Sequence, residues 1–256
     1  KSFSVGFLPH VLMAGLLMLL CLQQPDFGSA VMIGLLTFIL LFTAGARLGY
    51  ILGAGLCALP IVYGLVASSP MRMRRIQSFL APFENRQGAG YQLSEAFLSF
   101  GSGGLWGVGI GDSRQKLFYL PEAHTDFISA IVGEELGLIG LVLLILAFLI
   151  VFVRGVRAAF RASDDYGTYL AVGITMFIGM QAFTNLAVAM GMVPTKGLAL
   201  PFISYGGSSL LVNSAAIGVL LNVSRPRAPS GAPVAEEAGA KKGRASPARL
   251  AVGGTA

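Results

Sequence analysis

Charged side chains are scarce in this chain, and their scarcity excludes an ordinary soluble domain. Asp, Glu, Lys and Arg make up 12% of the 256 residues, whereas hydrophobic residues make up 55% and the mean hydropathy is +0.74. A soluble domain of this length and composition would expose too much apolar surface to water. We therefore interpret the chain as an integral membrane protein.

Cysteine and histidine are nearly absent, and an initiator Met is missing. Cys21 and Cys57 both fall inside apolar runs, which is typical of buried small hydrophobes and not of a disulfide framework or a cysteine metal site. His10 and His124 are too few for a histidine metal site, so we expect none, and no nucleic-acid partner. Because the chain begins at Lys1 without a charged n-region or a cleavage site, we expect the later part of a longer protein.

Apolar windows, by contrast, are abundant, and each is close to the ~20 residues that a bilayer requires. Lipid cannot satisfy exposed backbone groups, and nothing here alternates like a barrel strand, so these windows predict helices. Glu134 and Glu135 lie near the beginning of the fourth window. The expected fold is an all-α, polytopic membrane helix bundle with spans at about 7–23, 27–45, 49–68, 128–152, 168–190 and 206–222.

Basic residues predict the orientation of these spans, because short cytoplasmic loops collect Lys and Arg. The opposite short loops, 24–26 and 191–205, contain only Lys196, and a long loop is exempt from the rule. Residues 69–127 are therefore expected to be a large polar extracytoplasmic loop, and both ends of the chain to be cytoplasmic. The composition of the tail 225–256 predicts a solvated, disordered segment, although its basic side chains could also contact anionic lipid. The expected cytoplasmic side carries Lys1, Arg47, Arg154, Arg157, Arg161, Arg225, Arg227, Lys241, Lys242, Arg244 and Arg249.

The long loop brings cations to the membrane surface. Guanidinium groups bind pyrophosphate oxygens in a forked, charge-assisted way, so a lipid-linked pyrophosphate is one ligand that these cations would suit. A solvated basic loop near lipid headgroups is the alternative. The residues concerned are Arg72, Arg74, Arg75, Arg86, Arg114 and Lys116.

Glycine is dense between Gly101 and Gly111. No strand is expected before this run and no Gly-Lys-Ser/Thr follows it, so neither a P-loop nor a Rossmann fingerprint fits. We interpret the run as permissive backbone that lets the loop fold back over a cavity.

Among the acids, Asp126 stands out because it directly precedes the fourth span. A partly desolvated carboxylate at a water–lipid boundary can act as a general base. The alternative is helix capping by Thr125 or Asp126. His124 is a candidate ligand, proton carrier or packed ring. Glu134 and Glu135 suit either a structural pairing with a loop Arg or a catalytic role.

Four separated motifs resemble the SEDS family, the shape, elongation, division and sporulation proteins. In chain order they are QPDFG at 24–28, GGLWGVGIGDSRQKLFYLPEAHTDF at 103–127, GEELG at 133–137 and PTKGLALPFISYGGSS at 194–209. The match covers about residues 1–224. The wording of 116–126 and 193–198 resembles the division members more than the elongation members. Ser129 stands where a larger aromatic residue is expected, which is expected to alter the packing beneath Asp126.

The resemblance implies a fold of ten spans, of which this chain would hold the last six. It implies a peptidoglycan glycosyltransferase that polymerises lipid II at the division septum of the bacterial inner membrane and releases polyprenyl pyrophosphate. The implied partners are a class B penicillin-binding protein and other division proteins. A divalent cation such as Mg²⁺ or Mn²⁺ stays an open alternative, because no Asp-x-Asp pair marks a site.

Residue by residue, Asp126 matches the family's essential loop aspartate and becomes the candidate base. Arg72, Arg75, Lys116 and Lys196 are weaker candidates for pyrophosphate or peptide contacts, Glu122 and His124 are expected to shape the site, and Asp26 could pair with a loop cation.

Two other functions are compatible with a membrane bundle of this kind. A lipid II flippase needs polar groups near mid-membrane on facing helices. Here the acids crowd the outer boundary, and the polar residues within the spans, such as Gln181 and Asn185, are sparse and neutral. A scaffold that recruits a transpeptidase would leave the acids and bases of the loop without a role.

Overall fold

The computed structural model describes residues 3–84, 89–113 and 124–225, and every regular element in those ranges is a helix. The predicted all-α membrane fold is confirmed. The helices belong to one compact unit, Lys1–Ser224. Apart from Arg225, the tail predicted to be disordered lies outside the described residues. A short π-helical turn, Phe3–Phe7, precedes α1 (Leu8–Gln23), α2 (Phe27–Thr43), α3 (Leu48–Ala67), α4 (Pro70–Leu80), α5 (Ala89–Gly103), α7 (Ile128–Phe160), α8 (Asp165–Ala189) and α9 (Gly207–Val223).

A helix occupies each of the six expected apolar windows. By length and composition, α3, α7 and α8 are able to cross a membrane, whereas α1, α2 and α9 are equally apolar but have only 16, 17 and 17 residues. The 33 residues of α7 exceed the predicted fourth span because helix continues past Arg154 and Arg157 to Phe160. Backbone hydrogen bonding continues into the basic segment, which hydropathy alone does not detect.

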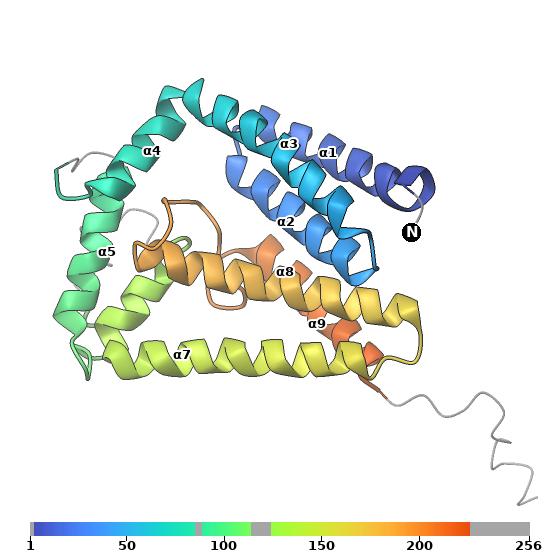
Figure 1. Ribbon diagram of the computed structural model, residues 1–256. Coiled ribbons are helices and arrows are strands. Elements are labelled where there is room, and N and C mark those ends of the chain that lie inside the picture. The colour runs from blue at the N-terminus through green and yellow to red at the C-terminus, as the bar shows by residue number, and fades with distance from the viewer. Residues whose placement is uncertain (1–2, 85–88, 114–123, 226–256) are drawn as a thin grey trace, which may run out of the picture. The chain divides into compact units, whose positions relative to one another are not determined.

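The connection predicted over 69–127 contains two helices that the sequence analysis did not anticipate. Pro70 occupies the first turn of α4, where its missing N–H costs nothing. Ser78 is buried on α4, while Arg74 on the same helix is exposed. Helix α5 packs against α7 and α4, as Figure 1 shows on the left of the bundle. The described part of the connection therefore places two helices, α4 and α5, at one end of the bundle.

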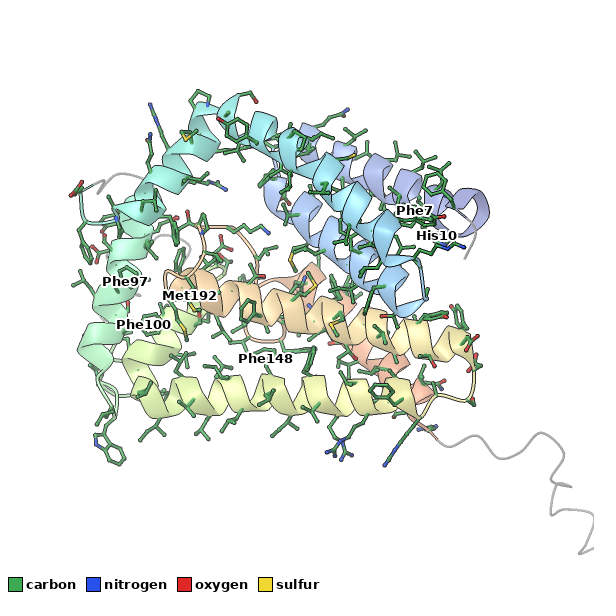
Figure 2. All side chains as sticks on the ribbon, in the orientation of Figure 1. Phe7, His10, Phe97, Phe100, Phe148 and Met192 are labelled. Carbon is green, nitrogen blue, oxygen red and sulfur yellow. The ribbon has the colours of Figure 1, made fainter. Side chains whose placement is uncertain are left out.

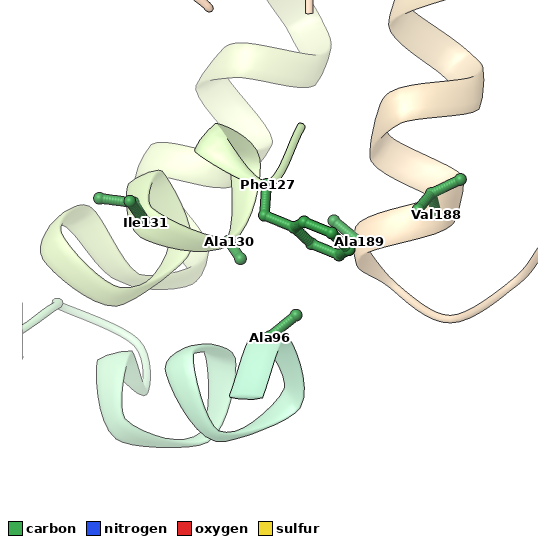
Figure 3. Packing of buried hydrophobic residues seen from close by; sticks show 6 residues of the cluster. All are labelled: Ala96, Phe127, Ala130, Ile131, Val188 and Ala189. Carbon is green, nitrogen blue, oxygen red and sulfur yellow. The ribbon is translucent and has the colours of Figure 1, made fainter. Parts of the chain in front are cut away.

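The best-buried apolar cluster lies where α5, α7 and α8 meet. Figure 3 shows the Phe127 ring directed at Ala189, with Ala96 of α5 facing Ala130. Two further rings of α5 point the same way: Phe100 lies against Gly133 and Phe97 against Gly191, close to Met192 (Figure 2). Small residues let these helices approach closely. The cluster fixes the start of α7 and the end of α8 relative to each other.

Helix α7 is broken at Gly137, whose φ of 66° and ψ of −164° are not helical. In a continuous helix the N–H groups of residues 138 and 139 would bond to the carbonyls of 134 and 135. Instead Leu138 N donates to Gly104 O (2.9 Å) and Ile139 N donates to Leu105 O (3.4 Å). The part of α7 before the break turns toward the end of α8 (Figure 1).

The partner of this break is Gly103–Gly111, which we call the glycine loop. Val108 N donates to Glu134 O (3.0 Å) and Gly109 N donates to Glu135 O (3.1 Å), so the loop also satisfies the freed carbonyls. A Cβ at Gly107, whose φ is 82°, would collide with the Glu135 carbonyl. The run does fold back, as expected from its glycines, but it packs onto the break in α7.

Candidate functional site

Asp126 lies directly before α7, in a turn that joins several elements. The N-cap residue of α7 is Phe127, so neither Thr125 nor Asp126 occupies the capping position that the alternative interpretation required. Asp126 is half-buried, and its carboxylate faces Gly197: a Cβ at Gly197 would stand 3.0 Å from Asp126 Oδ2. Glycine at position 197 thus lets the carboxylate approach the backbone closely, because a Cβ there would make a contact tighter than usual.

Asn185, in the last turns of α8, fixes the backbone of Asp126. Its Nδ2 group donates to Asp126 O (2.8 Å) and to Leu198 O (2.7 Å), and its Oδ1 accepts from Ser129 Oγ (3.1 Å). The side chain is only 2% exposed, so these bonds are made away from water. Low polarity strengthens such bonds and makes their loss costly. Ser129, the unexpected small residue, has become part of this network.

A second set of bonds joins the same turn to the loop before α9. Ser204 Oγ donates to Thr125 O and accepts from Leu200 N (2.8 Å), and Tyr205 N donates to His124 O (2.9 Å). His124 contributes its backbone here, while its side chain is exposed. Residues 124–127 are consequently held from two sides, by α8 and by 198–205.

Lys196 is the residue before Gly197 in the chain, and its side chain reaches the beginning of α2. Its stem lies on Gly28, where a Cβ would stand 2.5 Å from Lys196 Cε. Burial lowers the pKa of the Lys196 ammonium below its ordinary value, and the carboxylate of Asp26 partly offsets that effect. Asp26 caps α2 by accepting from Ser29 N (2.9 Å). The pairing of Asp26 with a loop cation stays a prediction, and Lys196 is the cation whose pKa the charge of Asp26 raises.

Arg72 approaches the same region from α4. Its Nη1 donates to Leu65 O (2.7 Å), and its guanidinium carbon lies 5.4 Å from the centroid of the Phe27 ring, the residue after Asp26. Arg75 lies one turn further along α4 and is half-buried. Arg72 and Lys196 therefore both reach the beginning of α2, one through Phe27 and one through Gly28.

Among the remaining candidates, the structure describes the partners of Glu134. Glu134 is only 2% exposed and accepts from Ser113 Oγ and from Ser102 Oγ (3.4 Å), which ties its side chain to α5 and to the residues just after the glycine loop. The roles predicted for Lys116 and Glu122 stay predictions, because both lie outside the described residues. Within the described ranges, no group of three or more His, Cys, Asp or Glu side chains is placed to hold a metal ion.

Sequence reasoning underrated one residue of the centre and left three without a role. Asn185 was counted only as a neutral residue within a span, although a polar side chain in an apolar window is itself a functional signal. Gly197, Ser204 and Tyr205 all belong to the motif at 194–209. The residue types of this motif do not reveal that it contacts residues 124–126. Only the fold places that loop over residues 124–127.

The helices and this cluster define a class: a multi-pass helical membrane protein with acid and base gathered where helix ends and loops meet. The chain belongs to the FtsW/RodA/SpoVE family of cell cycle proteins, whose model matches residues 1–228.

Two curated relatives are similar over 88% of the chain. A probable peptidoglycan glycosyltransferase FtsW from Geobacter sulfurreducens is 50% identical over 224 residues, and stage V sporulation protein E from Bacillus subtilis is 47% identical over 227 residues. The chain spans only about 60% of the length of these relatives.

Solved structures agree with the fold. A chain of a peptidoglycan synthase complex that coordinates polymerization and crosslinking is 27% identical, with a TM-score of 0.67 over 89% of this chain and 63% of that one. The rod shape determining protein RodA of Thermus thermophilus is also 27% identical, with a TM-score of 0.58 over 88% of this chain and 58% of that one.

Proposed function

We propose that this protein is a peptidoglycan glycosyltransferase that polymerises lipid II into glycan strands at the division septum of the bacterial inner membrane. The names of the relatives support this assignment. The observation that carries it is local: the half-buried carboxylate of Asp126 lies against Gly197, and Lys196, whose side chain reaches Gly28, is the residue before Gly197 in the chain. Glycosyl transfer to a hydroxyl needs a base for the acceptor and a cation that stabilises the leaving group, and we assign these two roles to Asp126 and Lys196.

In the proposed reaction, Asp126 accepts the proton of the 4-hydroxyl of the acceptor sugar. The hydroxyl oxygen forms a bond to the anomeric carbon of the donor. The bond from that carbon to the pyrophosphate oxygen breaks, and its electron pair leaves with the polyprenyl pyrophosphate. Lys196 and Arg72 stabilise the negative charge that develops on this leaving group. Arg75 and His124 are assigned to the edge of the same site, while the roles of Lys116 and Glu122 stay predictions from the sequence.

The direct test is polymerisation of purified lipid II by the full-length protein together with its transpeptidase partner, with glycan strands separated by size. The synthase complex among the structural relatives supports a penicillin-binding protein as that partner. We expect strands only when the full-length protein is present. The assay is run with and without Mg²⁺ or Mn²⁺, because the sequence leaves a divalent cation at the pyrophosphate open. A well-folded complex that makes no strands in either condition contradicts the proposal.

Neutralising Lys196 is expected to weaken use of the pyrophosphate donor. Loss of one charge-assisted contact costs about 1.5–3 kcal/mol, which corresponds to about a tenfold to hundredfold loss in kcat/KM for Lys196→Gln. Because burial already lowers the pKa of Lys196, its charge is lost as the pH rises through that lowered value. Asp26→Asn removes the influence that raises this pKa, so donor use should decline at a lower pH than in the unchanged protein.

The measurement is lipid II turnover as a function of pH for both variants. Arg47→Gln serves as the control, because Arg47 lies at the start of α3 and contacts the Tyr50 ring. The proposed role of Lys196 would be contradicted if Lys196→Gln kept full activity and if Asp26→Asn had the same pH profile as the unchanged protein. Lys196 would then be structural.

The membrane orientation is tested by cysteine labelling. With Cys21 and Cys57 replaced by Ala, we expect Arg74→Cys to react with an impermeant maleimide in intact cells, because α4 lies in the connection that we propose to be extracytoplasmic. Ser163→Cys, between α7 and α8, should react only after the cells are opened. Both Arg74 and Ser163 are exposed, so access to each depends on the side of the membrane. The reverse pattern would place the proposed chemistry in the cytoplasm and refute it.

A further inference from the structure

The glycine loop carries an exposed apolar surface that the proposed reaction does not use. Trp106 is 82% exposed and Ile110 is 83% exposed, and Leu105 beside them is also largely uncovered. Both large side chains sit in a short loop rich in glycine, where water would surround them in a soluble protein. An apolar group of this kind usually marks a surface that meets a partner or a membrane.

The backbone of this loop is satisfied by protein, which is the condition for non-helical chain at membrane depth. The break at Gly137 frees the carbonyls of residues 134 and 135 and the N–H groups of residues 138 and 139. The loop pairs with all four: Val108 N and Gly109 N donate to the carbonyls, and the carbonyls of Gly104 and Leu105 accept from the N–H groups. The loop and the break therefore satisfy each other's backbone hydrogen bonds.

The depth of the loop follows from the charge-free run of α7. After the break at Gly137, helix α7 runs for 16 residues without charge, from Leu138 to Val153, and Arg154 follows. At a rise of ~1.5 Å per residue this run is about 24 Å long, most of the ~30 Å hydrocarbon core of a bilayer. The loop bonds to Leu138 and Ile139, at the outer end of that run.

The lipid-facing side of α7 continues into the loop. Leu138, Ile139 and Leu143 on α7 are largely exposed, as expected of a span that contacts lipid. Leu105 and Trp106 follow the carbonyls that bond to the same turn of α7. Tryptophan is enriched at the boundary between hydrocarbon and headgroups, where its ring is apolar and its N–H finds water.

We propose that the glycine loop is a re-entrant membrane element, with Trp106 and Ile110 seated among lipid chains and headgroups at the outer boundary of the bilayer. The element belongs to the connection expected to be extracytoplasmic, but it does not stand in water. The lipid bilayer is the partner that covers its exposed apolar side chains. The proposal does not depend on the glycosyltransferase assignment.

Trp106 is the single tryptophan of the 256-residue chain, so its fluorescence reports this loop alone. The chain is reconstituted into phosphatidylcholine–phosphatidylglycerol vesicles that carry a spin label either high or low on the acyl chain. We expect blue-shifted emission, stronger quenching by the shallow label than by the deep label, and weak quenching by aqueous iodide. Two controls in a Trp106→Phe background calibrate the depth: Leu146→Trp within the α7 run, and Ser163→Trp in the exposed turn after Arg161.

Two outcomes would overturn the proposal. Quenching of Trp106 by iodide as strong as that of Ser163→Trp would place the loop in water. Protection from iodide together with no quenching by either lipid label would show that protein, and not lipid, covers the ring.

A perturbation of the docking tests the same idea without moving the tryptophan. Gly107→Ala places a Cβ against the Glu135 carbonyl at a φ of 82°, so the loop should leave the break and iodide quenching of Trp106 should rise several-fold. Gly101→Ala is the matched control, because a Cβ there meets nothing within 4 Å. Unchanged lipid quenching in a folded Gly107→Ala chain would contradict the proposed docking.

Discussion

Asp126→Asn is expected to abolish glycan strand synthesis while leaving the protein folded and inserted. The substitution keeps the size of the side chain and leaves the Asp126 carbonyl bonded to Asn185. The amide cannot accept the proton of the acceptor hydroxyl, and removal of a general base commonly lowers a rate by about 10²–10⁴-fold. The measurement is strand formation from lipid II by the full-length variant with its transpeptidase partner.

The control is Asp112→Asn, since Asp112 is an exposed carboxylate on the same connection and its backbone N bonds to Gly109 O. It should keep full activity. Near-normal synthesis by well-folded Asp126→Asn would refute the assignment, and the base would then be sought among Glu122, Glu134 and Glu135. If Asp126→Asn abolished lipid translocation while polymerisation depended on another enzyme, the flippase function would be favoured.

The second large effect is expected from Asn185→Leu, although Asn185 is not assigned to contact the substrate. The change removes the donor from Asp126 O and Leu198 O, and each buried acceptor left without a partner costs about 1–3 kcal/mol. The turn that carries Asp126 should shift, and a displacement of ~1 Å at a reacting group can lower a rate by about 10²-fold. We expect kcat to fall by about that factor while KM for the donor changes little.

Asn213→Leu is the matched control for this variant. Asn213 is 1% exposed and donates only within α9, to Ser209 O (2.9 Å) and Ser209 Oγ (3.2 Å). It should lower thermal stability in detergent without changing kcat. Asn185→Asp adds a second comparison, because the carboxylate keeps the size but cannot donate to the two carbonyls. If the Asn213 and Asn185 variants lost kcat equally, the effect of Asn185→Leu would be explained by general destabilisation, and the positioning role of Asn185 would be contradicted.

The helices of the bundle could be predicted because apolar windows report a bilayer directly. Lipid forces the backbone of each window to bond within itself, so hydropathy and length specify a helix without knowledge of its neighbours. Helices α4 and α5 were missed for the opposite reason. They lie in a polar connection, and they bury Ser78, Leu93 and Ala96 against other helices, which no hydropathy window detects.

The break in α7 illustrates the same limit. Glycine at position 137 is compatible with a continuous helix, and many glycines of this chain lie inside helices. What decides the conformation is the glycine loop, which supplies bonds to the four freed backbone groups. Those groups belong to segments about thirty residues apart, so neither segment specifies the break alone.

By itself, the sequence determined the membrane class, the six helical windows and the motifs that carry Asp126 and Lys196. The tertiary structure alone decided which side chains hold these residues in place. Asp126 and Asn185 are 59 residues apart, and they meet because the start of α7 packs against the end of α8. A hydrogen bond forms between atoms a few ångströms apart, and a linear pattern specifies such distances only within one helix or turn.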